Sequence, residues 1–181
     1  MNTKHHVERK VAQPFETVFI GSEKYPWIPW VNDCYLKVLK VNPTNGQFML
    51  MLKTPPQFTL PSHHHYGTVT VFTIQGMWSY VGHNWVAKPG DVVYEPAGSF
   101  HKPFTPPENN VPVITFNMLD GCLVFIDDDG NQLGILDWVA AAQMYYDYCA
   151  KEGIEPLDIE SYDTEPSNIK PPKDLSMKLY E

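Results

Sequence analysis

The fold is decided by the stretch Gly90-Asp91-Val92-Val93-Tyr94-Glu95-Pro96-Ala97-Gly98-Ser99-Phe100-His101, together with the shorter stretch His63-His64-His65. The long stretch has the spacing G-x(5)-P-x-G-x(2)-H, which places an imidazole just after a tight turn governed by glycine and proline. The short stretch places imidazoles at i and i+2, and on a β-strand these point to one face. Three neutral imidazoles that converge inside a β-barrel form a metal site. We therefore predict that His63, His65 and His101 bind a metal ion.

The residues beside these histidines refine the prediction. His64 points to the opposite face of the same strand, so we expect it to be solvated or to support the ligands from outside. Val69 stands where a carboxylate often follows such histidines, and it cannot bind a cation. Three protein ligands leave coordination positions open, which is typical of a catalytic rather than a structural metal site.

Composition excludes several classes of function. The chain has 181 residues and a formal net charge of −8, so we expect a single domain that binds neither nucleic acid nor anionic membrane surfaces. No apolar run of ~18 residues is present, and the polar start of the chain does not resemble a secretory signal. The three cysteines are widely spaced, which favours free thiols over a disulfide framework. These features predict a cytoplasmic protein.

Short β-type runs separated by turn residues dominate the middle of the chain. Many short strands at this spacing are typical of an antiparallel sandwich or barrel, so the predicted class is all-β. The run 77–81 is expected to form a hairpin with the run 68–74. The other predicted strands are 35–41, 47–53, 92–95, 111–119, 123–126 and 131–135.

The end of the chain departs from this β pattern. Apolar residues from 137 to 151 recur at helical spacing, Asp137 suits the N-cap, and Gly153 follows as a stop signal. The acidic, proline-rich tail 155–181 is expected to pack over its own barrel or over a neighbouring subunit. We divide this single domain into an N-terminal arm with edge strands (1–34), a barrel (35–136), and a helix with a tail (137–181).

The histidine motifs resemble the two sequence motifs of the cupin superfamily: His63-x-His65 followed by Gly76, and the stretch that ends at His101. The resemblance implies an antiparallel jelly-roll barrel with the metal inside, a C-terminal helix, and extended N- and C-terminal arms. Two departures stand out. The usual glutamate of the first motif falls on Val69 or Thr70, and Thr105 replaces the terminal asparagine of the second.

A narrower resemblance is to the cupin group named for 2,4'-dihydroxyacetophenone dioxygenase. It rests on the segment from Trp85 to Gly98, on Pro26-Trp27-Ile28-Pro29-Trp30, and on Phe125-Ile126-Asp127-Asp128-Asp129-Gly130. It implies Fe(II) as the cofactor, O2 as co-substrate, and cleavage of a C–C bond in a small aromatic hydroxyketone or diketone. Zinc, nickel or manganese could occupy the site of the purified protein.

Further site residues are expected near the motifs. The group leads us to expect a glutamate around residue 82, where this chain has Gly82 and His83; His83 either replaces it or is a solvated turn residue. Glu95 is a candidate catalytic base or a ligand-orienting carboxylate, and alternatively an exposed strand-end residue. The candidate substrate-binding side chains are Tyr66, Trp78, Tyr80 and Phe104.

Two other functions stay open at this point. One is a zinc-binding regulatory cupin, like those of anti-sigma factors, although no added cysteine ligand lies near His101. The other is a cupin isomerase or lyase without redox chemistry. Dependence on oxygen separates the dioxygenase from both. Cupins commonly exchange terminal strands, so we expect a homodimer or homotetramer.

Overall fold

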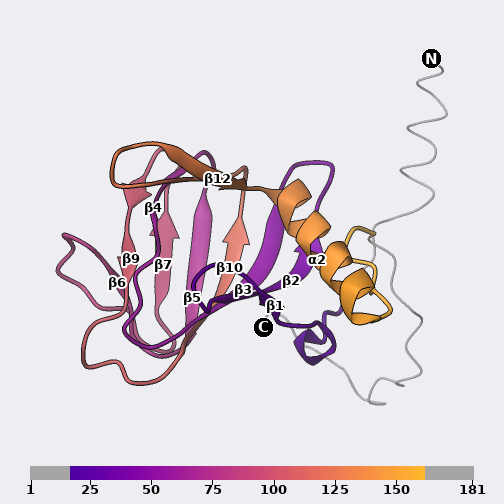
Figure 1. Cartoon of the computed structure of the whole chain (residues 1–181), viewed down its shortest axis with the longest axis horizontal. Coiled ribbons are helices and arrows are strands. Elements are labelled where there is room, and N and C mark those ends of the chain that lie inside the picture. The colour runs from indigo at the N-terminus through magenta and orange to yellow at the C-terminus, as the bar shows by residue number, and fades with distance from the viewer. Residues whose placement is uncertain (1–16, 162–181) are drawn as a thin grey trace, which may run out of the picture. The chain divides into compact units, whose positions relative to one another are not determined.

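The computed structural model describes residues 17–161, and residues 20–160 form one compact unit. The predicted N- and C-terminal arms lie outside the described residues over 1–16 and 162–181. The described chain is mostly antiparallel β-structure with one long helix near its end, as Figure 1 shows. The predicted all-β class is confirmed.

A six-stranded sheet forms one layer of the barrel. All its pairings are antiparallel, and along its central strand buried residues that point inward alternate with half-buried residues that point outward. The inward residues of the central strand are Val113, Thr115, Asn117 and Leu119. In spatial order the strands are β1 (Ile28–Pro29), β2 (Tyr35–Val41), β3 (Phe48–Thr54), β10 (Val113–Leu119), β5 (Val69–Gln75) and β7 (Val92–Glu95).

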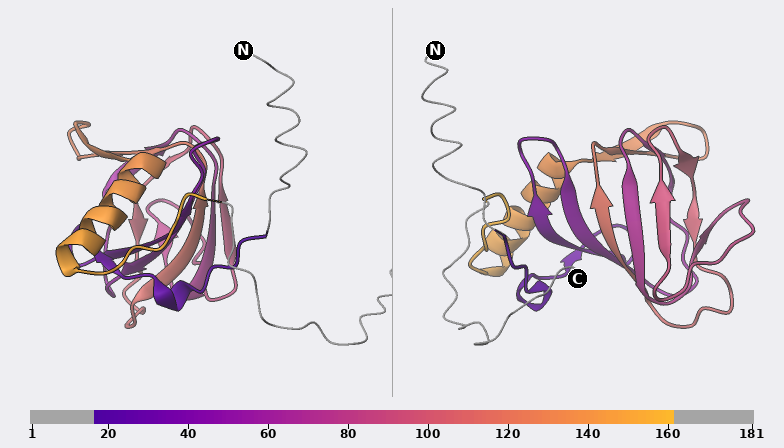
Figure 2. Two further views of the ribbon diagram at one scale, coloured as in Figure 1. Left: turned by 90° about the vertical axis from the view of Figure 1, so that its right-hand side faces the viewer. Right: turned by 180° about the vertical axis from the view of Figure 1, so that it is seen from behind.

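A four-stranded sheet forms the other layer (Figure 2). Two of its strands carry the histidines. Its order is β12 (Gln132–Leu136), β11 (Leu123–Ile126), β4 (Ser62–His65) and β8 (Phe100–His101). Buried apolar side chains from both sheets, including Leu36, Leu50 and Phe125, fill the space between them. Burial of each such side chain stabilises the fold by about 1.5–3 kcal/mol.

The predicted hairpin between 68–74 and 77–81 is wrong. β6 (Ser79–Tyr80) pairs instead with β9 (Pro103–Phe104) in a separate two-stranded sheet. A strand has only two edges, and both edges of β5 are already occupied, by β10 and β7. The chain after β5 therefore turns away, at Gly76 with φ of +79°, and leads Tyr80 back toward the histidines.

The helix α2 (Trp138–Glu152) begins and ends close to the predicted positions. Asp137 caps its start by accepting a hydrogen bond from the Ala140 amide at 2.8 Å, and Gly153 ends it in a left-handed conformation with φ of 66°. The following segment returns to the barrel. The Val41 amide donates to the Ile159 carbonyl at 2.8 Å, so the described part of the predicted tail does pack over its own barrel.

A close backbone approach links the histidine strand to the six-stranded sheet. At Gly67, which lies between β4 and β5, a Cβ atom would come 1.9 Å from the backbone oxygen of Asp120. Only glycine permits this contact. It fixes the end of β4, and with it His65, against the end of β10.

Candidate metal centre

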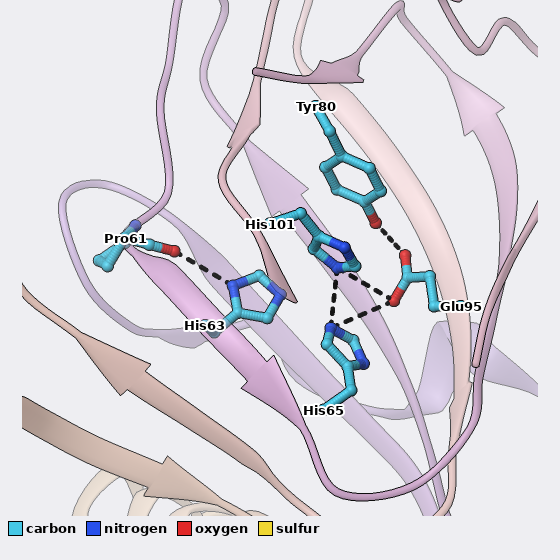
Figure 3. A network of polar contacts seen from close by, with 6 residues as sticks. All are labelled: Pro61, His63, His65, Tyr80, Glu95 and His101. Carbon is cyan, nitrogen blue, oxygen red and sulfur yellow. Dashed lines mark hydrogen bonds and ion pairs between the residues drawn. The ribbon is translucent and has the colours of Figure 1, made fainter. Parts of the chain in front are cut away.

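The three predicted ligands meet inside the barrel. β4 carries His63 and His65 on its inner face, and β8 pairs with it so that His101 lies opposite His63. Their exposed fractions are 5%, 2% and 8%, and Figure 3 shows the three rings turned toward a common point. His64 faces outward and packs on Phe100, with 4.5 Å between the ring centroids, as alternation along the strand predicts.

The spacing of the nitrogen atoms suits a metal ion. One ligand atom from each histidine lies within 4.8 Å of the others, and Nε2 of His65 is 2.9 Å from Nε2 of His101. With metal–nitrogen bonds of about 2.0–2.1 Å, two ligands at a right angle are about 2.9 Å apart. The donor set therefore fits a divalent transition metal.

Two of the three rings, His63 and His65, are kept in the neutral state that metal binding requires. The Nδ1 of His63 lies 3.1 Å from the Pro61 carbonyl, and because this oxygen only accepts, Nδ1 carries the proton and leaves the Nε2 lone pair for a metal. Burial lowers the pKa of His63 to about 4, against a raising effect of this hydrogen bond. Burial and the neighbouring imidazoles lower the pKa of His65 to about 3. Both rings are thus neutral at pH 7.

A carboxylate lies beside the histidines. Glu95, at the end of β7, is only 4% exposed, so the alternative of an exposed strand-end residue is wrong. Its Oε2 is 3.4 Å from Nε2 of His65 and 3.7 Å from Nε2 of His101. The carboxylate can therefore reach a metal ion, or a molecule bound to it.

Tyr80 connects this carboxylate to a ligand ring. Its hydroxyl donates a hydrogen bond to Oε1 of Glu95, and its ring stacks on His101 with centroids 3.8 Å apart and planes 10° apart (Figure 3). Burial and the nearby carboxylate raise the pKa of Tyr80 well above its ordinary value. Tyr80 therefore remains protonated at neutral pH and holds Glu95 in a fixed orientation.

A cavity of about 100 Å³ adjoins the histidines. Its walls are mainly apolar, and side chains from both sheets contribute to them. Among the predicted substrate-binding residues, Trp78, Tyr80 and Phe104 line it, as does Glu95. Three polar residues of the six-stranded sheet also line the cavity, and they were not predicted from the sequence: Thr54, Thr115 and Asn117. The sequence could have indicated them, because each is a polar residue at an inward-facing position of a largely apolar strand.

Two predicted site residues lie elsewhere. Tyr66 is 68% exposed and is not among the residues that line the cavity, because it follows His65 directly and alternation turns it outward. The prediction that it lines the cavity is therefore wrong. His83 is exposed in the turn after β6, where its Nδ1 accepts a hydrogen bond from the Trp85 indole at 3.1 Å. It too is absent from the cavity wall.

Two antiparallel sheets that enclose three inward-facing histidines are typical of the cupin fold. The chain belongs to the family described as the ChrR Cupin-like domain, which matches residues 16–118. No curated protein matches this chain. Within residues 17–161, no helix is both long and apolar enough to cross a membrane.

Solved structures agree with this assignment. An RmlC-like cupin protein from Ralstonia eutropha is 36% identical, with a TM-score of 0.79 over 82% of this chain and 97% of the other. A second R. eutropha protein with a cupin-like fold is 25% identical, with a TM-score of 0.73 over 87% and 99%. An acetylacetone dioxygenase from Acinetobacter johnsonii is 22% identical and shares the fold, with a TM-score of 0.62 over 75% and 93%.

Proposed function

We propose that this protein is an Fe(II)- and O2-dependent dioxygenase that cleaves a C–C bond in a small aromatic hydroxyketone or diketone. One observation carries the proposal: the three imidazoles lie beside a mainly apolar cavity, with a buried carboxylate–tyrosine pair next to them. A purely structural metal site needs neither a cavity nor an acid–base group.

The charge of the donor set favours an anionic substrate. His63, His65 and His101 would hold the ion, and three neutral ligands leave its full positive charge and several open positions. A bound ferrous ion would supply a Lewis acid for the substrate oxygens and the electrons for reaction with O2. The enolate of a hydroxyketone, with two adjacent oxygens, suits such a site.

Glu95 is the proposed base for forming that enolate. Its Oε2 faces the histidines, while its Oε1 accepts the hydrogen bond from Tyr80. Oε2 would take the proton from the substrate, and the Tyr80 hydroxyl would keep the carboxylate aimed at it. Such a base contributes about 10²–10⁴-fold to a rate.

The cavity wall supplies the fit for an aromatic ring. Trp78 and Phe104 present ring surfaces, and the surrounding aliphatic side chains exclude water. Exclusion of water protects a reactive intermediate from side reactions. The shared fold of an enzyme named acetylacetone dioxygenase supports including diketones among the compounds to be tested.

The test is oxygen uptake by the Fe(II)-loaded protein with a panel of 2-hydroxyacetophenones and 1,3-diketones. We expect metal-dependent uptake and a carboxylate product for at least one compound. The apo-protein and the His101→Ala variant are the controls. The absence of uptake with every compound, from protein that holds one iron per chain, would overturn the proposal.

A zinc-binding regulatory module is the second candidate. It is favoured by the family's relation to ChrR and by Glu95, because a carboxylate joined to three histidines closes a tetrahedral site. Tight zinc binding without oxygen uptake would support this candidate.

A further inference from the structure

The cavity has a second polar region, on the wall formed by the six-stranded sheet. Asn117 and Thr115 both point inward from β10, and they are 8% and 5% exposed. The strand neighbours of Asn117 on either side are Leu50 and Val71, and both are buried and apolar. An amide in such surroundings is unfavourable unless its hydrogen-bonding atoms find partners.

The orientation of this amide follows from its contacts. Asn117 Nδ2 lies 2.9 Å from Oγ1 of Thr115 and 3.4 Å from the Thr115 carbonyl. Since a backbone carbonyl only accepts hydrogen bonds, the nitrogen must be the atom that faces it. The Oδ1 atom has no hydrogen-bond partner within residues 17–161. It is therefore an acceptor in a residue that lines the cavity, and a bound molecule can use it.

The ladder pairing places this acceptor relative to the metal ligands. Glu95 pairs with Val69, and Val69 pairs with Leu119, two residues beyond Asn117 on the same inward face. Strands lie about 4.8 Å apart and rise about 3.4 Å per residue, so the Cα atoms of Glu95 and Asn117 are ~10 Å apart across the sheet and ~7 Å along it. Both side chains project into the barrel from the same face of this sheet, so one bound molecule reaches both only if it extends across the cavity.

We propose that Asn117 determines substrate specificity: its Oδ1 accepts a hydrogen bond from a donor group at the end of the substrate remote from the metal. For an aromatic ketone, this donor is a hydroxyl on the ring opposite the ketone side chain. The inference rests on the proposed function. A substrate without the hydroxyl would bury Oδ1 unpaired, so its affinity should be lower by about 10-fold or more.

The test is binding to the full-length protein loaded with redox-inert Zn(II), measured by titration calorimetry. The paired ligands are 2,4'-dihydroxyacetophenone and 2-hydroxyacetophenone, which differ only in the ring hydroxyl. We expect the wild-type protein to bind the hydroxylated ligand at least 10-fold more tightly. Asn117→Leu, close to asparagine in shape, should remove this preference without weakening binding of the other ligand.

Thr54→Val is the matched control, since it removes another polar group of the cavity wall and should retain the preference. Asn117→Ala replaces Asn117→Leu if the leucine variant does not fold. Equal affinities in the wild type, or a preference that survives in the Asn117 variants, would overturn this inference alone. Failure of the wild type to bind either ligand would overturn this inference as well, whereas the proposed function is decided separately by oxygen uptake with the wider panel that includes diketones.

Discussion

Glu95 is the antiparallel partner of Val69 in the ladder that joins β7 to β5. Paired residues point to the same face of a sheet, so the carboxylate enters the barrel beside the valine that stands in place of the first-motif glutamate. Strand β7 therefore places the Glu95 carboxylate close to the position at which the first-motif glutamate would lie. The buried carboxylate beside the histidines therefore belongs to the second motif.

Replacing Glu95 with glutamine should separate catalysis from metal binding. Glutamine keeps the shape but cannot accept a proton, so we expect kcat to fall by about 100-fold or more while iron stoichiometry is retained. Steady-state oxygen uptake and metal analysis of the same sample measure both. An unchanged kcat would remove Glu95 from the mechanism, and loss of iron would make it a ligand.

Tyr80→Phe tests the hydrogen bond that orients this carboxylate. The variant keeps the ring that stacks on His101 and loses only the hydroxyl donated to Glu95. A hydrogen bond to a charged group is worth about 1.5–3 kcal/mol, so kcat should fall by roughly 10- to 100-fold with normal iron content. Wild-type turnover by this variant would show that Glu95 needs no help from Tyr80.

Two neighbouring histidines provide a matched pair of variants for the metal. His101→Ala removes one of three ligands and should abolish stoichiometric iron binding. His64→Ala removes an imidazole that faces outward against Phe100, so its iron content should equal that of the wild type. Metal analysis after dialysis checks both. Full occupancy in His101→Ala would contradict the ligand assignment.

The metal-free protein should lose stability as the pH falls below about 6.5. The pKa values of His63 and His65 are lowered from 6.5 to about 4 and about 3 in the folded state, so both rings stay neutral while their unfolded counterparts bind protons. The unfolded chain therefore binds more protons below about pH 6.5, and stability falls as the pH decreases from there toward 4. Urea unfolding of apo-protein at pH 7 and pH 5 measures this, with the His63→Gln/His65→Gln double variant as control. Equal stabilities of the wild type at the two pH values would refute it.

The close backbone approach at Gly67 requires glycine, whereas Gly134 has room for a larger side chain. Alanine at Gly67 would place its Cβ 1.9 Å from the Asp120 backbone oxygen, whereas a Cβ at Gly134 meets nothing within 4 Å. We expect Gly67→Ala to lose more than about 3 kcal/mol of the free energy of unfolding, and Gly134→Ala to change it by less than about 0.5 kcal/mol. Denaturant unfolding gives both values, and similar losses would refute the steric argument.

Local sequence determined much of this protein. The i, i+2 spacing of His63 and His65 and the turn before His101 were enough to predict the ligands, because alternation and turn chemistry depend on only a few adjacent residues. The cap at Asp137 and the glycine stop are local for the same reason. The structure confirms that the three histidines converge and that the helix has this cap and this stop, and metal binding by the histidines stays a prediction.

Only the tertiary structure decided what surrounds the ligands. The contact of Tyr80 with Glu95, the pairing of β6 with β9, and the inward position of Asn117 depend on which distant strands become neighbours. The prediction that Tyr66 lines the cavity relied on its position next to His65 in the sequence, and it was wrong because Tyr66 faces outward. The direction of a side chain is set locally, whereas its neighbours are set by strand order, which reflects the burial of apolar surface over the whole barrel.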